Sequence, residues 1–381
     1  MTTLNKLKSN KKVAERAYLV GLSSLSKIDY IKEELLLNEL KELVESAGAM
    51  VVGHAIQKRK SPHPATYIGE GKLIEIINLI NMLDINLLVV NGGLSGTQQM
   101  VIESKTGIKV LDRNAVILDV FATRAKSREA LLQVSLAQNE YLLPRLRGQW
   151  THLERFSGGI GSRGPGETQL ETDRRLVSQR ISLLRKKIKK IYAHRARLRS
   201  NRTKNSIPNV GIIGYTNAGK SSMMQAICKR KPSVANRPFE TLDTTTGKVW
   251  ANKGLYFSIT DTVGFFSNLP IELTSAFKAT IEEINNADIL LHVVDGSSIN
   301  VGIQIDSVKQ ALIDLELSSI PMITSINKVD LMNNAAINDI SKNISTKFTN
   351  NIDCIATSTK KDIGIAQVKN ALKYELFGQY K

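Results

Sequence analysis

Cysteine and long apolar runs are scarce in this chain of 381 residues. The two cysteines, Cys228 and Cys354, have no C-x-x-C spacing and lie in apolar segments, so we expect reduced core thiols and no disulfide or metal site. No apolar run approaches the length of a membrane span, and the N-terminal MTTLNKLKSNKK has no apolar signal region. These absences predict a cytoplasmic protein, and the length indicates two or three domains.

Negative charge is missing from one long segment. Between Arg174 and Lys204 the chain has thirteen Lys or Arg and no Asp or Glu, and this segment supplies most of the excess in a formal net charge of +17. Its apolar residues form one helical stripe: Val177, Ile181, Leu184, Ile188, Ile191 and Leu198. The pattern predicts an amphipathic helix with a basic outer face. Such a face is usually only solvated, but uncompensated like charges repel one another, which favours a polyanionic partner.

A second helix is expected upstream, because residues 127–146 contain no helix breaker before Pro144. A similar stripe in it consists of Leu131, Val134, Gln138 and Tyr141, so we expect the two helices to pair as an antiparallel coiled coil. The connecting residues 157–166 hold five glycines, one proline and Arg163, and Arg155 lies just before them. Such a loop is either a flexible linker or an RNA contact. Its place at the tip of a basic hairpin favours RNA, because glycines admit a phosphate or base and arginines bind either.

The octapeptide GYTNAGKS matches the G-x-x-x-x-G-K-[ST] template of a phosphate-binding loop. The template positions are Gly214, Gly219, Lys220 and Ser221, and between them lie Tyr215, Thr216, Asn217 and Ala218. Residues 210–213 are predicted to form the strand before the loop and residues 222–228 the helix after it, which is the context that this motif requires. Lys220 would reach the β- and γ-phosphates, and the Ser221 hydroxyl would bind Mg²⁺.

Two further motifs follow in the order that a GTPase requires. The first is DTVG after the strand-like LYFSIT, with Asp261, Thr262, Val263 and Gly264; the second is NKVD after PMITSI, with Asn327, Lys328, Val329 and Asp330. Asp261 would hold Mg²⁺ through a water, and the Gly264 N–H would face the γ-phosphate. Asp330 would accept hydrogen bonds from the guanine N1–H and exocyclic amine, Asn327 would join the base loop to the phosphate loop, and the Lys328 stem would pack on the base. This order predicts a GTPase that binds guanine nucleotides.

Two segments complete the predicted site. A switch that closes over the γ-phosphate is expected at FETLD, which comprises Phe239, Glu240, Thr241, Leu242 and Asp243, and a further base loop at Ser358, Thr359 and Lys360. Thr241 is the expected second protein ligand of Mg²⁺, with residues 244–246 as competitors. Lys220, Thr241 and Gly264 are therefore the candidate catalytic residues. Phe265 occupies the position of the water-orienting Gln of Ras-like GTPases, so intrinsic hydrolysis is expected to be slow until a partner supplies a missing group.

The first 125 residues predict a smaller α/β domain. Strands are expected at 16–22, 50–56, 66–68, 85–91 and 108–112, and helices at 31–48, 72–83, 96–105 and 113–125. Their alternation favours a largely parallel sheet. The segment Gly69-Glu70-Gly71-Lys72 lacks the spacing of a phosphate loop and is expected to be a structural turn.

With these motifs in place, the chain resembles the HflX family of ribosome-associated GTPases. The most specific string is GGIGSRGPGETQLETDRR (158–175), close to the family's GGIGTRGPGETQLETDRR. The resemblance implies an α/β fold in which a P-loop GTPase domain (205–381) follows a smaller α/β domain (1–125) and a basic helical hairpin (126–204). It also implies a monomer, with GTP as substrate and Mg²⁺ as cofactor, that binds the large 50S ribosomal subunit and its rRNA. Asn217 matches an asparagine that helps hold an activating K⁺ in related GTPases. In the switch, FETLDTTTG departs from the family's FATLDPTTR.

Two mechanisms from different classes follow from the resemblance. In the first, GTP binding directs docking on the ribosome in ribosome rescue, subunit dissociation or protein synthesis, and hydrolysis releases the protein. In the second, the protein is an assembly or stress-binding module whose GTP cycle only times its residence on a precursor 50S particle. A GTPase that assists tRNA modification is a more distant alternative, because no additional catalytic cysteine or cofactor motif is found in the N-terminal half.

Overall fold

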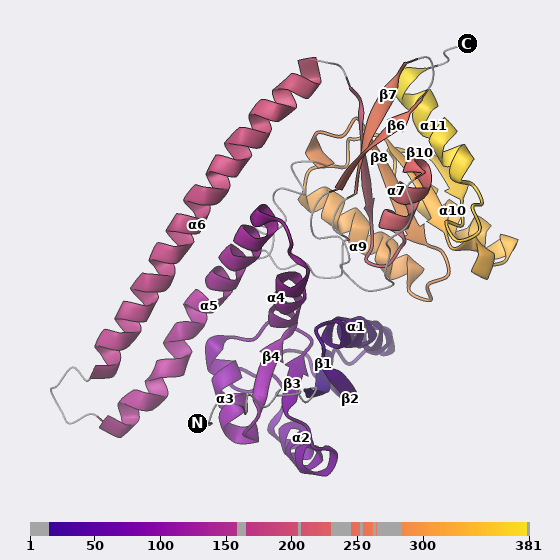
Figure 1. Ribbon diagram of the computed structural model, residues 1–381. Coiled ribbons are helices and arrows are strands. Elements are labelled where there is room, and N and C mark those ends of the chain that lie inside the picture. Colours follow the sequence, from indigo (N-terminus) through magenta and orange to yellow (C-terminus); the bar gives the residue numbers. More distant parts are fainter. Residues whose placement is uncertain are drawn as a thin grey trace, which may run out of the picture. The chain divides into compact units, whose positions relative to one another are not determined.

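A computed structural model describes residues 15–157, 165–204, 207–229, 245–251, 254–261, 264 and 284–378. The chain divides into two compact units, Met1–Ile117 and Leu118–Lys381. Both are built from alternating helices and strands, which confirms the α/β class (Figure 1). No helix within these ranges is long and apolar enough to cross a bilayer.

The first unit is built on a four-stranded sheet in the order β2-β1-β3-β4, and every pairing within it is parallel. Its strands are β1 (Arg16–Ser23), β2 (Met50–Lys58), β3 (Leu87–Val90) and β4 (Lys109–Asp112). The first three helices are α1 (Lys27–Ser46), α2 (Glu70–Leu83) and α3 (Gly96–Thr106), and α4 (Arg113–Arg124) begins at the end of the unit. Capping residues fix some of these ends: the Ser26 hydroxyl accepts from the Asp29 N–H, and Ser95 and Gln98 form a capping box. The predicted parallel sheet is confirmed.

The predicted strand at 66–68 is wrong. Tyr67 forms only an isolated bridge with His63, and its φ of 63° is incompatible with a strand. The Thr66 hydroxyl donates to the Ile68 carbonyl over 2.7 Å, which folds the segment into a compact turn. Gly69 then caps α2, and its N–H donates to Gln57 Oε1 over 2.7 Å. The glycines of this segment therefore lie at the start of a helix, which agrees with the prediction that the segment has a structural role.

The hairpin consists of two long antiparallel helices, α5 (Arg128–Ser157) and α6 (Pro165–Lys204) (Figure 1). Gln133 Nε2 donates to the Tyr192 hydroxyl over 3.1 Å, and Arg185 pairs with Glu140 at 2.7 Å. Ile181, Leu184 and Ile188 of the predicted α6 stripe are buried, which confirms the amphipathic helix. The helix α5 continues past Pro144, beyond its predicted end, and α6 begins at Pro165, where a missing N–H costs no helical hydrogen bond. Residues 158–164 of the predicted RNA-binding loop lie outside the described residues.

The predicted α5 stripe is partly wrong. Leu131 is 49% exposed, whereas Leu136 is buried and packs on the α6 stripe together with Leu132 and Leu143. The helix has apolar residues on more than one flank, so the helical period alone did not determine which flank meets α6.

The predicted GTPase domain contains a six-stranded sheet in the order β10-β9-β8-β5-β7-β6, in which only β6 is antiparallel to its neighbour. Its strands are β5 (Asn209–Gly214), β6 (Thr245–Trp250), β7 (Tyr256–Asp261), β8 (Ile289–Asp295), β9 (Met322–Asn327) and β10 (Asn351–Ala356). The helices labelled in its described part are α7 (Lys220–Cys228), α9 (Val301–Asp314), η1 (Val329–Leu331), α10 (Asn334–Lys347) and α11 (Ile365–Phe377). Because β5, β7, β8 and β9 are parallel, the loops that follow them leave the same edge of the sheet.

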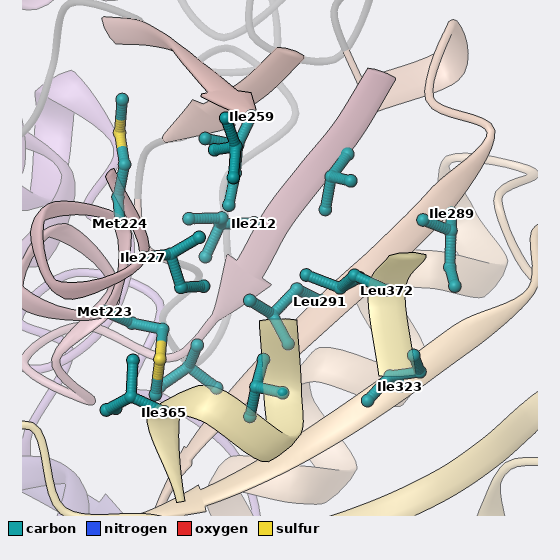
Figure 2. Close-up of a cluster of buried hydrophobic side chains, with 14 of the residues drawn as sticks. Ile212, Met223, Met224, Ile227, Ile259, Ile289, Leu291, Ile323, Ile365 and Leu372 are labelled. Carbon is teal, nitrogen blue, oxygen red and sulfur yellow. The ribbon is translucent and has the colours of Figure 1, made fainter. Parts of the chain in front are cut away.

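One face of this sheet is covered by α7 and α11. Figure 2 shows the contact: Met223, Met224 and Ile227 of α7 and Ile365 and Leu372 of α11 pack against the strand residues Ile212, Ile259, Leu291 and Ile323. All of these side chains are buried, and each contributes roughly 1.5–3 kcal/mol by leaving water. This packing fixes α7, and with it Lys220 and Ser221, beside the carboxyl end of β5.

Candidate nucleotide site

The predicted phosphate loop connects β5 to the first turn of α7. Lys220 is buried, and its Nζ donates to the Tyr215 carbonyl oxygen over 2.7 Å, so the side chain lies along the loop. Gly219 has a φ of +96°, and a Cβ on it would overlap Asn327 Nδ2. The turn therefore requires glycine both for its backbone conformation and for the close approach of β9.

The end of β7 meets the start of α7. The Ser221 hydroxyl donates to Asp261 Oδ2 over 2.6 Å, and Asp261 is 2% exposed. Gly264 lies against the phosphate loop, because a Cβ on it would be 2.7 Å from Lys220 Nζ and 2.9 Å from Thr216 Cα. Two segments about forty residues apart thus place a hydroxyl, a carboxylate and an ammonium group together.

The NKVD segment follows β9 and touches both neighbouring loops. Asn327 is 1% exposed; its Nδ2 donates to the Ala218 carbonyl over 2.9 Å, and its Oδ1 accepts from the Thr359 N–H over 3.2 Å. The Ser358 hydroxyl donates to Asp330 Oδ1 over 2.6 Å. Asn327 therefore joins the phosphate loop to residues 358–360. The sequence predicted its link to the phosphate loop but not its link to Thr359.

Three family descriptions match consecutive parts of the chain. Residues 33–122 match the GTP-binding GTPase N-terminal family, residues 124–202 its middle region and residues 209–328 the 50S ribosome-binding GTPase family. GTPase HflX of Caldanaerobacter subterraneus is 43% identical over 363 residues, which cover 95% of this chain and 81% of that protein. GTPase HflX of Escherichia coli is 38% identical over 343 residues, with 90% and 79% covered.

The chain belongs to the HflX family of GTPases. A solved structure of the protein SsGBP with GDP has the same fold: it is 25% identical, the TM-score is 0.52, and the match covers 96% of this chain and 99% of that one. Membership of the HflX family makes this chain a GTPase, in agreement with the order of its motifs.

Burial controls the electrostatics of this HflX-family site. Desolvation lowers the pKa of Lys220 to about 8, and the nearby Asp261 carboxylate opposes that shift. The hydrogen bond from Ser358 holds the pKa of Asp330 below its usual range. An anion that binds beside a buried lysine with few fixed counter-charges strongly stabilises its charged form, so the loop is suited to a polyphosphate.

The donor set around Ser221 fits a magnesium ion. Mg²⁺ prefers oxygen ligands and retains several waters, and a serine hydroxyl and a carboxylate lie 2.6 Å apart here. Within the described ranges no group of three or more His, Cys, Asp or Glu could hold a metal. A magnesium ion would therefore take its remaining ligands from phosphate, from water or from the switch threonine.

Several predicted residues of the HflX-type site lie outside the described residues. These are Thr262, Val263, Phe265 and the switch residues Phe239, Glu240, Thr241, Leu242 and Asp243. Two of the threonines that compete with Thr241, Thr245 and Thr246, are exposed at the start of β6. The other predicted residues gather at the carboxyl edge of the sheet: Gly214, Asp261 and Asn327 end β5, β7 and β9, Lys220 and Ser221 begin α7, Asp330 lies in η1, and Gly264 and residues 358–360 lie in loops.

Asp295 is a site residue that the sequence interpretation missed. Its Oδ2 accepts from Lys328 Nζ over 2.7 Å, and its Oδ1 accepts from the Ser297 hydroxyl over 2.7 Å. This ion pair holds the end of the Lys328 side chain, whose stem is predicted to pack on the base. The available signal was an acidic residue at the end of the apolar run ILLHVV, directly before a turn.

Proposed function

We propose that this GTPase hydrolyses GTP as a factor bound to the large ribosomal subunit, in ribosome rescue, subunit dissociation or protein synthesis. The observation that carries the nucleotide part is the hydrogen bond from Asn327 to the Ala218 carbonyl. It holds the base-reading segment against the phosphate loop, so that one molecule carrying both guanine and phosphates would contact both. The ribosomal part rests on the 50S ribosome-binding GTPase match over residues 209–328 and on the basic α6.

Each motif then has a defined task. Backbone N–H groups of residues 214–221 and Lys220 bind the phosphates, and Asp330, Asn327, Lys328 and residues 358–360 select guanine. Mg²⁺, held by Ser221 and Thr241 and by Asp261 through water, would neutralise charge on the β- and γ-phosphates. The Gly264 N–H faces the γ-phosphate, and FETLD closes over it. Loss of these contacts after hydrolysis releases both segments, which is how the nucleotide state reaches the ribosome-bound surfaces.

A partner is needed because Phe265 supplies no polar group to orient water. The test is GTP turnover with and without purified 50S subunits in a K⁺ buffer. Stimulation of roughly a hundredfold or more is expected if the ribosome completes the site. A turnover rate that is unchanged by 50S subunits would show that the ribosome is not the activator.

The particle that is bound separates the two mechanisms. GTP-dependent separation of intact 70S particles supports rescue or dissociation, whereas binding confined to immature 50S particles supports residence during assembly. Repeating turnover in Na⁺ tests the K⁺ role of Asn217, which is exposed with a φ of 60°. Equal rates in the two salts would exclude that role.

A further inference from the structure

The helix α6 has two different flanks beside its buried stripe. At about 100° per residue, Leu176, Arg180, Leu183 and Lys187 lie within about 60° of one another, whereas Lys189 lies at least about 120° from each of them and Lys186 lies between the two positions. Leu176 is 55% exposed and Leu183 is 58% exposed. Solvated basic helices have no need of leucines at heptad spacing on an open flank, so this flank has the pattern of a surface that packs against another helix.

A groove runs along this flank between the two helices of the hairpin. Its volume is about 570 Å³, and its apolar floor includes Leu131 and Leu132 of α5 and Leu183 of α6. Leu131 and Leu183 are half exposed, and Leu132 and Leu184, which also line the groove, belong to the hairpin core. A third helix bound in this groove would extend the packing of the two helices, because α5 and α6 each line the groove with residues at three- and four-residue spacing.

The rim of the groove has charge of one sign only. Arg128, Arg180 and Lys187 line it, no Asp or Glu lines it, and none of these three cations forms an ion pair within the described residues. Arg185 of α6 lies on another flank and pairs with Glu140. An occupant that brings carboxylates beside apolar side chains would satisfy both the rim and the floor.

We propose that this groove docks an acidic amphipathic helix of a separate protein, with aliphatic side chains on the leucine floor and carboxylates against Arg128, Arg180 and Lys187. RNA fits less well, because phosphates and sugars cannot cover exposed leucines with apolar surface. This contact uses the groove and not the remaining basic surface of α6, on which the proposed ribosomal function rests. It can therefore hold or fail independently of the ribosomal function.

The test uses the full chain and a labelled helical peptide of three heptads, with leucine at positions a and d and glutamate at e and g. The control peptide has the same composition in scrambled order. Fluorescence anisotropy is expected to show the patterned peptide binding at least about tenfold more tightly than the scrambled one. The variant Leu131→Gln/Leu183→Gln should lose about tenfold in affinity, since two apolar contacts are removed.

A matched variant separates patterned docking from general attraction to a basic protein. Lys186→Gln/Lys189→Gln removes two charges that do not line the groove and should change peptide affinity by about twofold or less. Circular dichroism checks that both variants keep their helices, which the exposure of all four side chains permits.

Four outcomes would overturn the proposal. Equal binding of the two peptides would mean that charge alone attracts them, and undiminished binding by the leucine variant would place the peptide elsewhere. Loss of single-stranded RNA binding in the leucine variant, but not in the lysine variant, would make the groove an RNA surface. Sedimentation of the parent chain as a dimer that the leucine substitutions dissociate would make the occupant a second copy.

Discussion

The protonation state of Lys220 is expected to change when a nucleotide binds to the phosphate loop. Burial lowers its pKa to about 8, so the free protein at pH 8.5 holds it mostly neutral. A bound polyphosphate favours the charged form, so nucleotide binding should take up a fraction of a proton. Isothermal titration calorimetry with GDP at pH 8.5, in buffers of different ionisation enthalpy, measures this uptake as a buffer-dependent heat.

The same experiment at pH 7 is its control. Lys220 is already protonated there, so the uptake should nearly vanish and the heats in the different buffers should agree. Buffer-independent heats at pH 8.5 would show that Lys220 is charged before the nucleotide arrives.

Asp330 is expected to decide which base is accepted. Its carboxylate would accept from the guanine N1–H and amine, and its Oδ1 already accepts from Ser358. In Asp330→Asn the oxygen can still serve Ser358, but the amide N–H₂ then opposes the donors of guanine. GTP affinity should fall roughly a hundredfold or more. Xanthosine triphosphate, which carries a carbonyl in place of the amine, should gain relative to GTP; competition binding measures both, and an unchanged preference would remove Asp330 from base selection.

At the scale of elements, the sequence predicted the strands and the start of α7 better than the packing of the hairpin. Alternating apolar runs and the GKS motif define β5 and α7 because strand, glycine turn and helix are all local signals. The pairing of α5 was wrong at Leu131, because the helix has apolar side chains on two flanks and only contact with α6 selects one. Residues 66–68 are of types that are common in strands, yet the hydrogen bonds of Thr66 fold them into a turn.

The basic flank of α6 gives a prediction about salt. Arg185 is paired with Glu140 and Lys187 lines the groove, whereas Lys186 and Lys189 are exposed and do not line it. If this flank binds ribosomal RNA, Lys186→Gln/Lys189→Gln should weaken 50S binding. The slope of log affinity against log salt should fall by about 1.5 to 2, as two phosphate contacts are lost. Binding titrations at several KCl concentrations measure the slope.

A charge-matched variant is available on the GTPase domain. Lys309→Gln/Lys342→Gln removes the same charge from α9 and α10 and should leave the salt slope close to that of the parent. If both double variants lowered the slope equally, net charge and not the α6 flank would govern binding.

For the whole molecule, motif order predicted which segments meet, but not every contact between them. Asn327 was expected to contact the phosphate loop, because the two motifs that contain them are predicted to bind the same nucleotide. The Asp295–Lys328 pair was not expected, since a single acid after an apolar strand matches no motif and its partner is known only once β8 and β9 are adjacent. The groove beside α6 likewise exists only after both helices have packed.

His292 links the stability of the GTPase domain to pH. It is 1% exposed on β8, with its ring edge-on to Phe348 at a centroid distance of 5.4 Å. Burial, and secondly the positive charge of Lys220, lower its pKa to about 3. Between pH 6.5 and 3 the unfolded chain therefore binds a proton at this side chain that the folded chain does not. Stability from the neutral ring is present above pH 6.5 and decreases as the pH falls.

Removing the imidazole should remove this part of the acid sensitivity. Between pH 7 and pH 5 the His292 contribution to the free energy of unfolding falls by about 2 kcal/mol. His292→Leu keeps an apolar side chain in the same place but cannot be protonated, so the variant should lose about that much less than the parent over the same interval. Urea unfolding of both chains at the two pH values gives the double difference, in which any pH-independent effect of the substitution cancels. Parallel losses in parent and variant would mean that the folded domain accepts a proton at His292, which its burial opposes.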